Sequence, residues 1–125
     1  MAGVLNVRVH LSHTLGHQIG ARWDVPHGLT SGITLAAVMR HLEAENPGGV
    51  VRVAAAFDAS TVDAGADAIT ALVESLGLPT CLRDVGANRA DFPAVAEATL
   101  AAGRATGYVP TGGADSLVAL LETMY

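Results

Sequence analysis

The chain has 125 residues, a length typical of one domain, and 50% of them are apolar, so a hydrophobic core can form without disulfides. The formal net charge is -5 with no run of like charges, which argues against nucleic acid and anionic membranes as partners. The single cysteine, Cys81, excludes an internal disulfide. No signal peptide is visible and no apolar stretch approaches the roughly 18 residues of a membrane span, so we expect a soluble cytoplasmic protein.

The N-terminal part of the chain predicts a helix over residues 4–21. Leu11, Leu15 and Ile19 recur every four residues, so they form one apolar stripe along such a helix. Pro26 predicts a boundary beyond it, because a proline disfavours the helical conformation in the residue before it. We therefore expect one amphipathic helix followed by a short connection.

The middle of the chain predicts three further helices. Residues 28–43 fit a second helix, which the Asn-Pro-Gly-Gly segment at 46–49 is expected to break. Residues 50–57 fit a helix or a strand by pattern, and their three consecutive alanines favour a helix. The next helix is expected over residues 62–76, with N-cap candidates at 58–61.

The C-terminal part predicts two more helices. Either Asn88 or Asp91 is expected to cap the first of them, with Pro93 in its first turn and Gly103 as its terminator. The second is expected after the two glycines at 112–113. Its apolar residues lie three and four apart and mark one buried face: Leu117, Leu120, Leu121 and Met124. No segment alternates as a strand does, so the predicted fold is an all-α bundle forming a single domain over residues 1–125.

Histidines are concentrated near the N-terminus. His10, His13 and His17 lie three and four residues apart, so they share the side of the predicted helix opposite its apolar stripe. His27 follows in a Pro-His-Gly segment at the start of the next helix. Imidazole is a common ligand for zinc, iron and nickel, although the spacing is not the HExxH signature, which also needs a glutamate. On spacing alone, a metal or catalytic role and a role in packing both remain open.

The segment from His13 to Gly28 reads H-T-L-G-H-Q-I-G-A-R-W-D-V-P-H-G. It resembles the signature of the iron-containing (group III) alcohol dehydrogenase family, to which the maleylacetate reductases belong. That signature is a His, a second His four residues on, a following Gly, an aromatic-Asp-aliphatic stretch, and Pro-His-Gly. The resemblance continues in segments 76–86, 91–100 and 115–121, and it corresponds to the last third of a typical member. It implies the fold of the family's helical C-terminal domain.

The resemblance also implies roles for single residues. His13 and His27 match the two metal-ligating histidines of that domain, which implies a site for iron or zinc. His17 matches a non-ligand histidine near substrate and nicotinamide, which implies a catalytic role in proton transfer. Asp24 is expected to act as a helix cap, and Gly28 is expected to allow close packing at a helix start.

Two parts of the family's catalytic machinery have no counterpart in this sequence. The family completes its metal site with an Asp and a His from a helix well upstream, so the site expected here is partial. The chain has no Gly-x-Gly-x-x-Gly, so we expect the N-terminal nucleotide-binding domain, and with it the NAD(P) site, to be missing. Two imidazoles bind metal weakly compared with a full site. We therefore expect no dehydrogenase activity from this chain by itself.

The resemblance implies metal-assisted hydride transfer between NAD(P) and a small alcohol, aldehyde or keto acid once the site is completed. The expected partners are the missing nucleotide-binding domain or a second copy of the chain. An exposed apolar face near Val4, Val7 and Leu11 would favour a two-fold dimer. The alternative is a stand-alone helical binding or scaffold module with a vestigial or partial metal site.

The remaining distinctive side chains have simpler interpretations. Cys81 is expected to be a half-buried small hydrophobe rather than a reactive thiol, because Arg83 is the only basic residue near it in sequence. Trp23 is expected to anchor the connection by packing, with contact to substrate left open. His41 is expected at the surface near a helix C-terminus, where a cation is favourable. Met39 and Met124 are expected in the core.

Overall fold

The computed structural model describes residues 10–125, and this part of the chain is helical. The elements follow in this order: α2 (Leu11–Trp23), α3 (His27–His41), α4 (Pro47–Ala55), α5 (Val62–Ser75), the short 3-10 helices η1 (Leu82–Val85) and η2 (Arg89–Asp91), α6 (Phe92–Thr106) and α7 (Gly113–Thr123). Residues 10–125 contain no strand, so the predicted all-α fold is confirmed. None of the described helices is long and apolar enough to cross a membrane.

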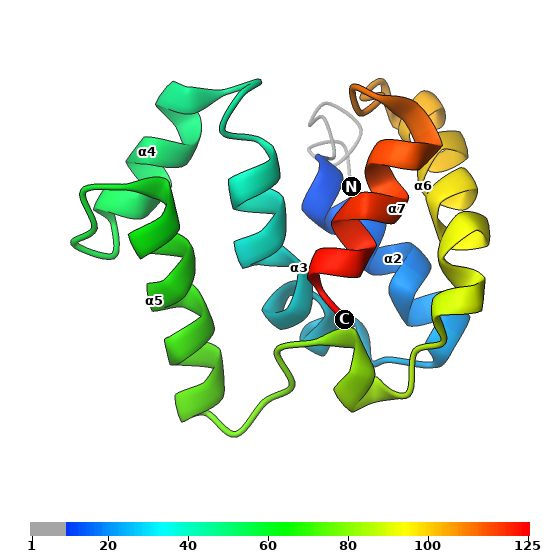
Figure 1. Ribbon diagram of the computed structural model, residues 1–125, viewed down its shortest axis with the longest axis horizontal. Helices are drawn as coiled ribbons and strands as arrows, with labels where there is room; N and C mark the ends of the chain where they lie inside the picture. Colours follow the sequence, from blue (N-terminus) through cyan, green and yellow to red (C-terminus); the bar gives the residue numbers. More distant parts are fainter. Residues whose placement is uncertain (1–9) are drawn as a thin grey trace, which may run out of the picture.

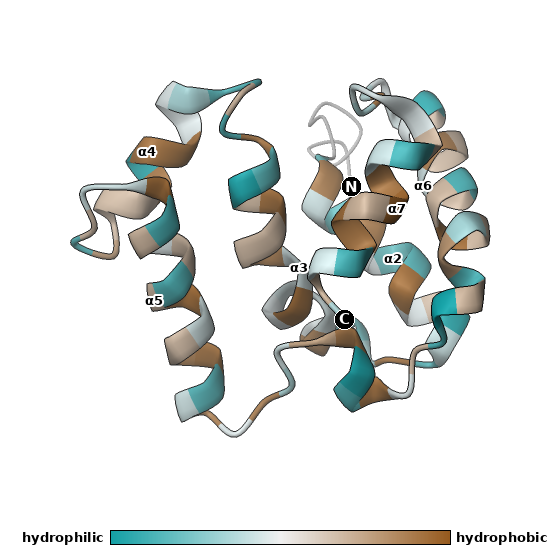
Figure 2. Ribbon diagram, viewed as in Figure 1, coloured by the Kyte–Doolittle hydropathy of each residue, from teal (hydrophilic) through white to brown (hydrophobic). Residues whose placement is uncertain are grey.

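Helix α3 lies between two groups of helices (Figure 1). Helices α2 and α7 pack on one side of it, with α6 against both of them, and α5 packs on the other side and carries α4. Apolar residues line the sides of the helices that face their neighbours (Figure 2). Every described α-helix contributes to the hydrophobic core. The two groups are therefore joined through α3.

Helix α2 confirms the stripe predicted from the four-residue spacing. Leu11, Leu15 and Ile19 are each 0% exposed. Leu11 was also expected on an exposed apolar face, and that expectation is wrong because its side chain points into the core. The predicted helix over residues 4–21 is not continuous, because His10 is extended and α2 begins at Leu11. Residues 4–9, which include Val4 and Val7, lie outside the described residues.

The connection between α2 and α3 is a tight left-handed turn. Asp24 has φ 53° and stands at the C-terminal cap of α2, and the Val25 N–H donates to the Gly20 carbonyl oxygen at 3.2 Å. Asp24 is thus a cap, but of the end of α2 and not of the start of α3, where Pro26 holds the N-cap position. The turn sends α3 back along α2, and His27 is the first residue of α3.

The start of α4 differs from the prediction. The segment expected to break a helix forms the first turn of a new one, because the Asn46 side chain accepts a hydrogen bond from the Gly49 N–H at 3.1 Å and Pro47 occupies the first turn. The preference for a helix over residues 50–57 is confirmed, since α4 runs to Ala55. Thr61 caps α5 as predicted by accepting from the Ala64 N–H at 3.1 Å.

The C-terminal end of α6 differs from the prediction. Gly103 was expected to terminate it, but α6 continues to Thr106 and ends at Gly107, whose φ is 84°. Gly103 is instead the point where the chain returns across the helix, and a Cβ there would overlap the carbonyl oxygen of Tyr108. Pro93 lies in the first turn as predicted, whereas the cap candidate Asn88 caps η2.

Candidate metal centre

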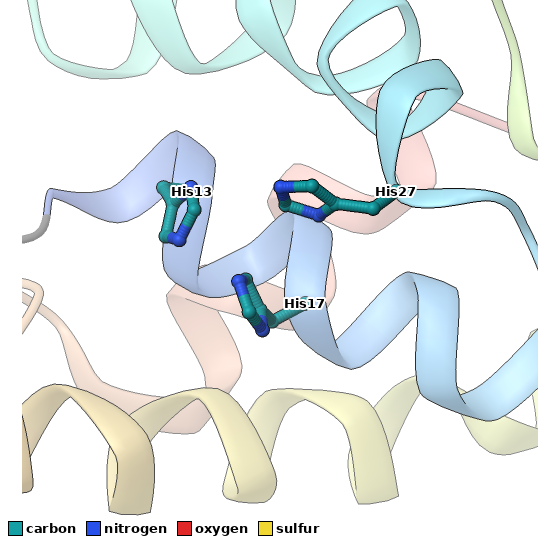
Figure 3. Close-up of side chains that lie close together, drawn as sticks. All are labelled: His13, His17 and His27. Atoms are coloured by element: carbon teal, nitrogen blue, oxygen red, sulfur yellow. The ribbon is translucent and has the colours of Figure 1, made fainter.

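Three histidines converge on one exposed face. His13 and His17 project from α2, and His27 projects toward them from the start of α3 (Figure 3). One potential ligand atom from each imidazole lies within 4.8 Å of the other two. The ring centroids are 4.4 Å apart for His13 and His17, 4.8 Å for His17 and His27, and 5.3 Å for His13 and His27. Three imidazole donors in one place fit a borderline divalent ion such as zinc, iron or nickel.

Backbone packing beneath the imidazoles holds α2 and α3 together. Gly16 lies between His13 and His17 in the sequence, and a Cβ at Gly16 would stand 2.9 Å from Thr30 Oγ1 and 3.3 Å from Thr30 Cβ. Thr30 is one turn beyond His27, and its hydroxyl donates to the His27 carbonyl oxygen at 2.8 Å. The missing side chain of Gly16 therefore sets the separation between the two helix segments that carry the histidines.

The close approach was predicted at the wrong glycine. Gly28 was expected to allow close packing at the start of α3, but a Cβ at Gly28 would meet no atom within 4 Å. The motif gave no means to tell the two glycines apart, because the distinction depends on which side of each helix faces the other.

His10 does not belong to the cluster, although its spacing placed it on the same face as His13 and His17. It precedes the first turn of α2 in extended conformation, and its ring stacks on Tyr108 at 4.1 Å between centroids. The Tyr108 hydroxyl donates to Glu45 Oε2 at 2.9 Å. Burial first, and then the neighbouring Glu45, raise the pKa of Tyr108 to about 12. His41 is the last residue of α3, as predicted, and is half-buried.

The cluster favours the neutral imidazole at His17. Partial burial, followed by the repulsive charges of His13 and His27, lowers the pKa of His17 from its ordinary value. A neutral imidazole has a lone pair that can bind a metal or accept a proton. His17 is therefore chemically ready for either task.

A groove of about 260 Å³ adjoins the cluster. It runs between α2 and α6, and its lining residues are His13, Thr14, His17, Gln18, Ala102 and Thr106. Sequence reasoning missed the part of this lining that comes from Gln18, Ala102 and Thr106. Gln18 is not among the residues that the family signature specifies, and Ala102 and Thr106 reach the site only because α6 packs against α2.

The Trp23 side chain is a packing anchor, as predicted. Its ring stands edge-on to Phe92 with 6.0 Å between centroids, and its indole N–H donates to Asp91 Oδ2 at 3.3 Å. Arg22 reaches the same carboxylate at 2.6 Å. Hydrogen bonds from Arg22 above all hold the pKa of Asp91 below its ordinary range. These contacts tie the end of α2 to the start of α6.

Two of the minor predictions concern burial. Cys81 is half-buried, as expected for a small hydrophobe. Met39 and Met124 are each 3% exposed, which confirms their predicted place in the core.

The fold and the histidine face together define a helical domain in which three imidazoles gather at the junction of two helices. Residues 1–125 match the family described as "Fe-containing alcohol dehydrogenase family, C-terminal". The chain therefore belongs to the iron-containing alcohol dehydrogenase family, as the resemblance of the His13–Gly28 segment predicted.

Two relatives show how much of a longer family member this chain matches. The chain is 30% identical to 1,3-propanediol dehydrogenase of Klebsiella pneumoniae over 96% of its own length and 33% of the relative. It is 36% identical to lactaldehyde reductase of Escherichia coli (strain K12) over 78% of its own length and 28% of the relative. The chain thus spans about a third of the length of the curated relatives it matches.

Solved structures agree on the fold. A 1,3-propanediol oxidoreductase is 26% identical with a TM-score of 0.73, and the match covers 94% of this chain and 33% of that one. An alcohol dehydrogenase from Oenococcus oeni has a TM-score of 0.84 at 24% identity, over 96% of this chain and 33% of that one, which shows likeness of fold alone.

Proposed function

We propose that residues 1–125 act as the metal-binding domain of an NAD(P)-linked alcohol dehydrogenase. The observation that carries this proposal is the convergence of His13, His17 and His27 on one face, with ligand atoms within 4.8 Å of one another. Membership of the iron-containing alcohol dehydrogenase family supports it, because metal and nicotinamide chemistry are properties of that family.

In this proposal His13 and His27 hold an iron or zinc ion, and His17 acts as the catalytic proton carrier. The bound ion supplies Lewis acidity toward the oxygen of an alcohol or carbonyl group. His17 would accept the hydroxyl proton of a bound alcohol as the carbon gives up its hydride, because its imidazole lies beside the two proposed ligands. The groove between α2 and α6 has room for a small alcohol, aldehyde or keto acid.

The remaining metal ligands and the nicotinamide site are proposed to come from an N-terminal nucleotide-binding domain. The share of the relatives that this chain spans, about a third, supports that division. We therefore expect no turnover when residues 1–125 alone are assayed with NADH or NADPH, ferrous iron or zinc, and small aldehydes. Clear turnover in that assay would contradict the division of roles.

A chimeric chain tests the proposal directly. In it, these 125 residues replace the aligned C-terminal third of 1,3-propanediol dehydrogenase of Klebsiella pneumoniae. We expect the chimera to oxidise small alcohols, His13→Ala and His27→Ala to lose both metal and turnover, and His17→Ala to keep metal and lose turnover. His41→Ala is the matched control and should behave as the parent. A folded chimera that binds metal and nicotinamide but oxidises none of a panel of small alcohols would count against the proposal.

The second candidate, a binding or scaffold module that self-associates, rests on a different observation. Large apolar side chains are exposed on and just after α4 and α5, namely Val51 (48%), Val53 (42%), Phe57 (36%), Leu72 (50%) and Leu76 (64%). Exposed apolar side chains favour association where they gather into a patch, and a two-fold dimer is the simplest form. Light scattering at working concentration tests it, and a monomer would contradict it.

A further inference from the structure

His17 lies closer to His13 and to His27 than those two histidines lie to each other. Its ring centroid lies 4.4 Å from that of His13 and 4.8 Å from that of His27. Both separations are shorter than the 5.3 Å between His13 and His27. An ion held jointly by His13 and His27 would therefore fall within reach of His17.

The distances are compatible with one shared ion. Zinc–nitrogen bonds are about 2.1 Å, so nitrogens around a tetrahedral ion lie roughly 3.4 Å apart. The three histidines offer ligand atoms within 4.8 Å of one another, and all three residues are exposed. Because the three imidazoles are exposed, rotation about their side-chain bonds can bring the ligand atoms closer together.

The backbone beneath the three rings is fixed. His13 and His17 stand one turn apart on α2, and the close contact of Gly16 with Thr30 holds the start of α3 beside them. Ligands that are already placed on rigid elements lose little entropy when they bind an ion.

We propose that His17 is a third ligand in this chain, so that residues 1–125 by themselves bind one divalent ion through three imidazoles. This does not rest on the proposed function, in which His17 carries a proton after ligands from another domain complete the site. The two roles belong to two states: His17 coordinates while the ion lacks other protein ligands, and is free to exchange a proton once they are present.

The donor set determines which ions bind well. No carboxylate or thiolate joins the three imidazoles in the clusters found among the described residues. Imidazole donors suit zinc, copper, iron and nickel, and the affinity of a given site for divalent ions rises from manganese through iron and cobalt to nickel and copper. The chain alone should therefore bind Zn²⁺, Ni²⁺ and Cu²⁺ more tightly than Fe²⁺, although its family is named for iron.

The experiment is a zinc titration of the full 125-residue chain against a chromophoric chelator, at fixed pH. We expect one Zn²⁺ per chain, and a loss of affinity of at least roughly tenfold in His13→Ala, His27→Ala and His17→Ala alike, because each removes one of three bonds. His17→Gln, which keeps a polar side chain of similar length, should lose as much as His17→Ala. His41→Ala is the control and should bind as the parent does. Circular dichroism checks that each variant remains helical.

Zinc-dependent imidazole shifts in nitrogen-detected NMR give an independent readout. His13, His17 and His27 should shift together at one equivalent, whereas His10 and His41 should not. Unchanged zinc affinity in His17→Ala and His17→Gln would overturn the proposal in favour of two ligands, and absence of stoichiometric zinc binding by the parent chain would overturn it altogether. Failure of the chimera to turn over alcohol would leave this titration unaffected, so the two proposals fail separately.

Discussion

The α2–α3 pair and the α4–α5 pair pack through the same device, a glycine facing a small side chain on the partner helix. A Cβ at Gly16 would meet Thr30 Oγ1 at 2.9 Å, and a Cβ at Gly65 would meet Ala54 Cβ at 2.7 Å. In both pairs the absent side chain allows two helices to approach closely. The exposed residues of the two helix pairs are different.

On the outer side of α2 and α3, exposed imidazoles gather. On and just after α4 and α5, the exposed residues include valines and leucines, and Leu76 is 64% exposed. The same packing therefore supports a cluster of potential ligand groups in one region and exposed apolar side chains in the other. Changes in the two regions should be separable by what they alter: ion binding and stability in the first, association and stability in the second.

The two phenylalanines of the chain give the largest expected contrast. Phe92 is 0% exposed and packs between Trp23 and Tyr125, whereas Phe57 is 36% exposed just beyond α4. Phe92→Ala should lower the free energy of unfolding by about 3–5 kcal/mol, because it leaves a cavity in the core. Phe57→Ala should cost less than about 1 kcal/mol. Urea unfolding monitored by circular dichroism measures both, and equal losses would contradict the assignment of the core.

Replacing Gly16 or Gly65 by alanine should lower the free energy of unfolding by a similar amount. The two changes should differ in their effect on zinc affinity. Gly16→Ala and Gly65→Ala should each lower the free energy of unfolding by roughly 1–3 kcal/mol, since the helices must separate to admit the methyl group. Zinc affinity should fall in Gly16→Ala alone, because only that change moves His27 away from His13 and His17.

Gly28→Ala is the matched control for both glycines. A Cβ there meets nothing within 4 Å, so stability should be unchanged or slightly higher, with zinc affinity unaltered. If Gly65→Ala weakened zinc binding as strongly as Gly16→Ala, the two regions would not be separable in this way.

The sequence correctly predicted those helix faces whose burial follows from the spacing of neighbouring apolar residues. The four-residue spacing in α2 and the three-four-three spacing of Leu117, Leu120, Leu121 and Met124 placed two buried faces, and all of these residues are buried. The His13–Gly28 motif identified the family. Periodicity works here because each stripe contacts one continuous core.

Three of the errors share one cause, which is dependence on a distant segment. Gly103 resembles a terminator in isolation, but it lies inside α6 because the chain after Gly107 folds back over it. His10 shares the spacing of the other histidines, yet the Tyr108 ring from the α6–α7 connection takes it out of the cluster. The α6 lining of the groove, Ala102 and Thr106, was not predicted because only tertiary packing brings it to the histidines.

Tyr108 lies after α6, and its hydroxyl donates to Glu45 in the connection after α3. Deleting this hydroxyl tests whether the two regions depend on each other. Tyr108→Phe deletes the hydrogen bond to Glu45 and keeps the ring against His10. The free energy of unfolding should fall by about 0.5–1 kcal/mol at pH 7. Urea unfolding measures the loss, and zinc affinity should remain that of the parent.

The same variant predicts a difference in pH dependence. The folded state raises the pKa of Tyr108 to about 12, so between roughly pH 10 and 12 it keeps a proton that the unfolded chain releases. The parent should therefore lose stability with rising pH in that interval more steeply than Tyr108→Phe. The chain has no lysine to obscure the effect. Parallel stability curves for the two proteins would contradict the assigned environment of the hydroxyl.

The smallest expected effect on stability comes from changing two exposed leucines near the end of α5, and this change tests whether they take part in association. Leu72 and Leu76 are one turn apart at the end of α5, at 50% and 64% exposure, and neither belongs to the core. The double change Leu72→Lys and Leu76→Lys should alter the free energy of unfolding by no more than about 0.5 kcal/mol, because lysine is a good helix former and little apolar area is buried there. If this face joins two copies, sedimentation velocity should show the parent as a dimer and the variant as a monomer at the same concentration. Zinc affinity should be equal in both, since the histidine face lies across α3 from α5. A variant that dimerises as the parent does would place the contact elsewhere and leave the apolar side of α5 without a role in association.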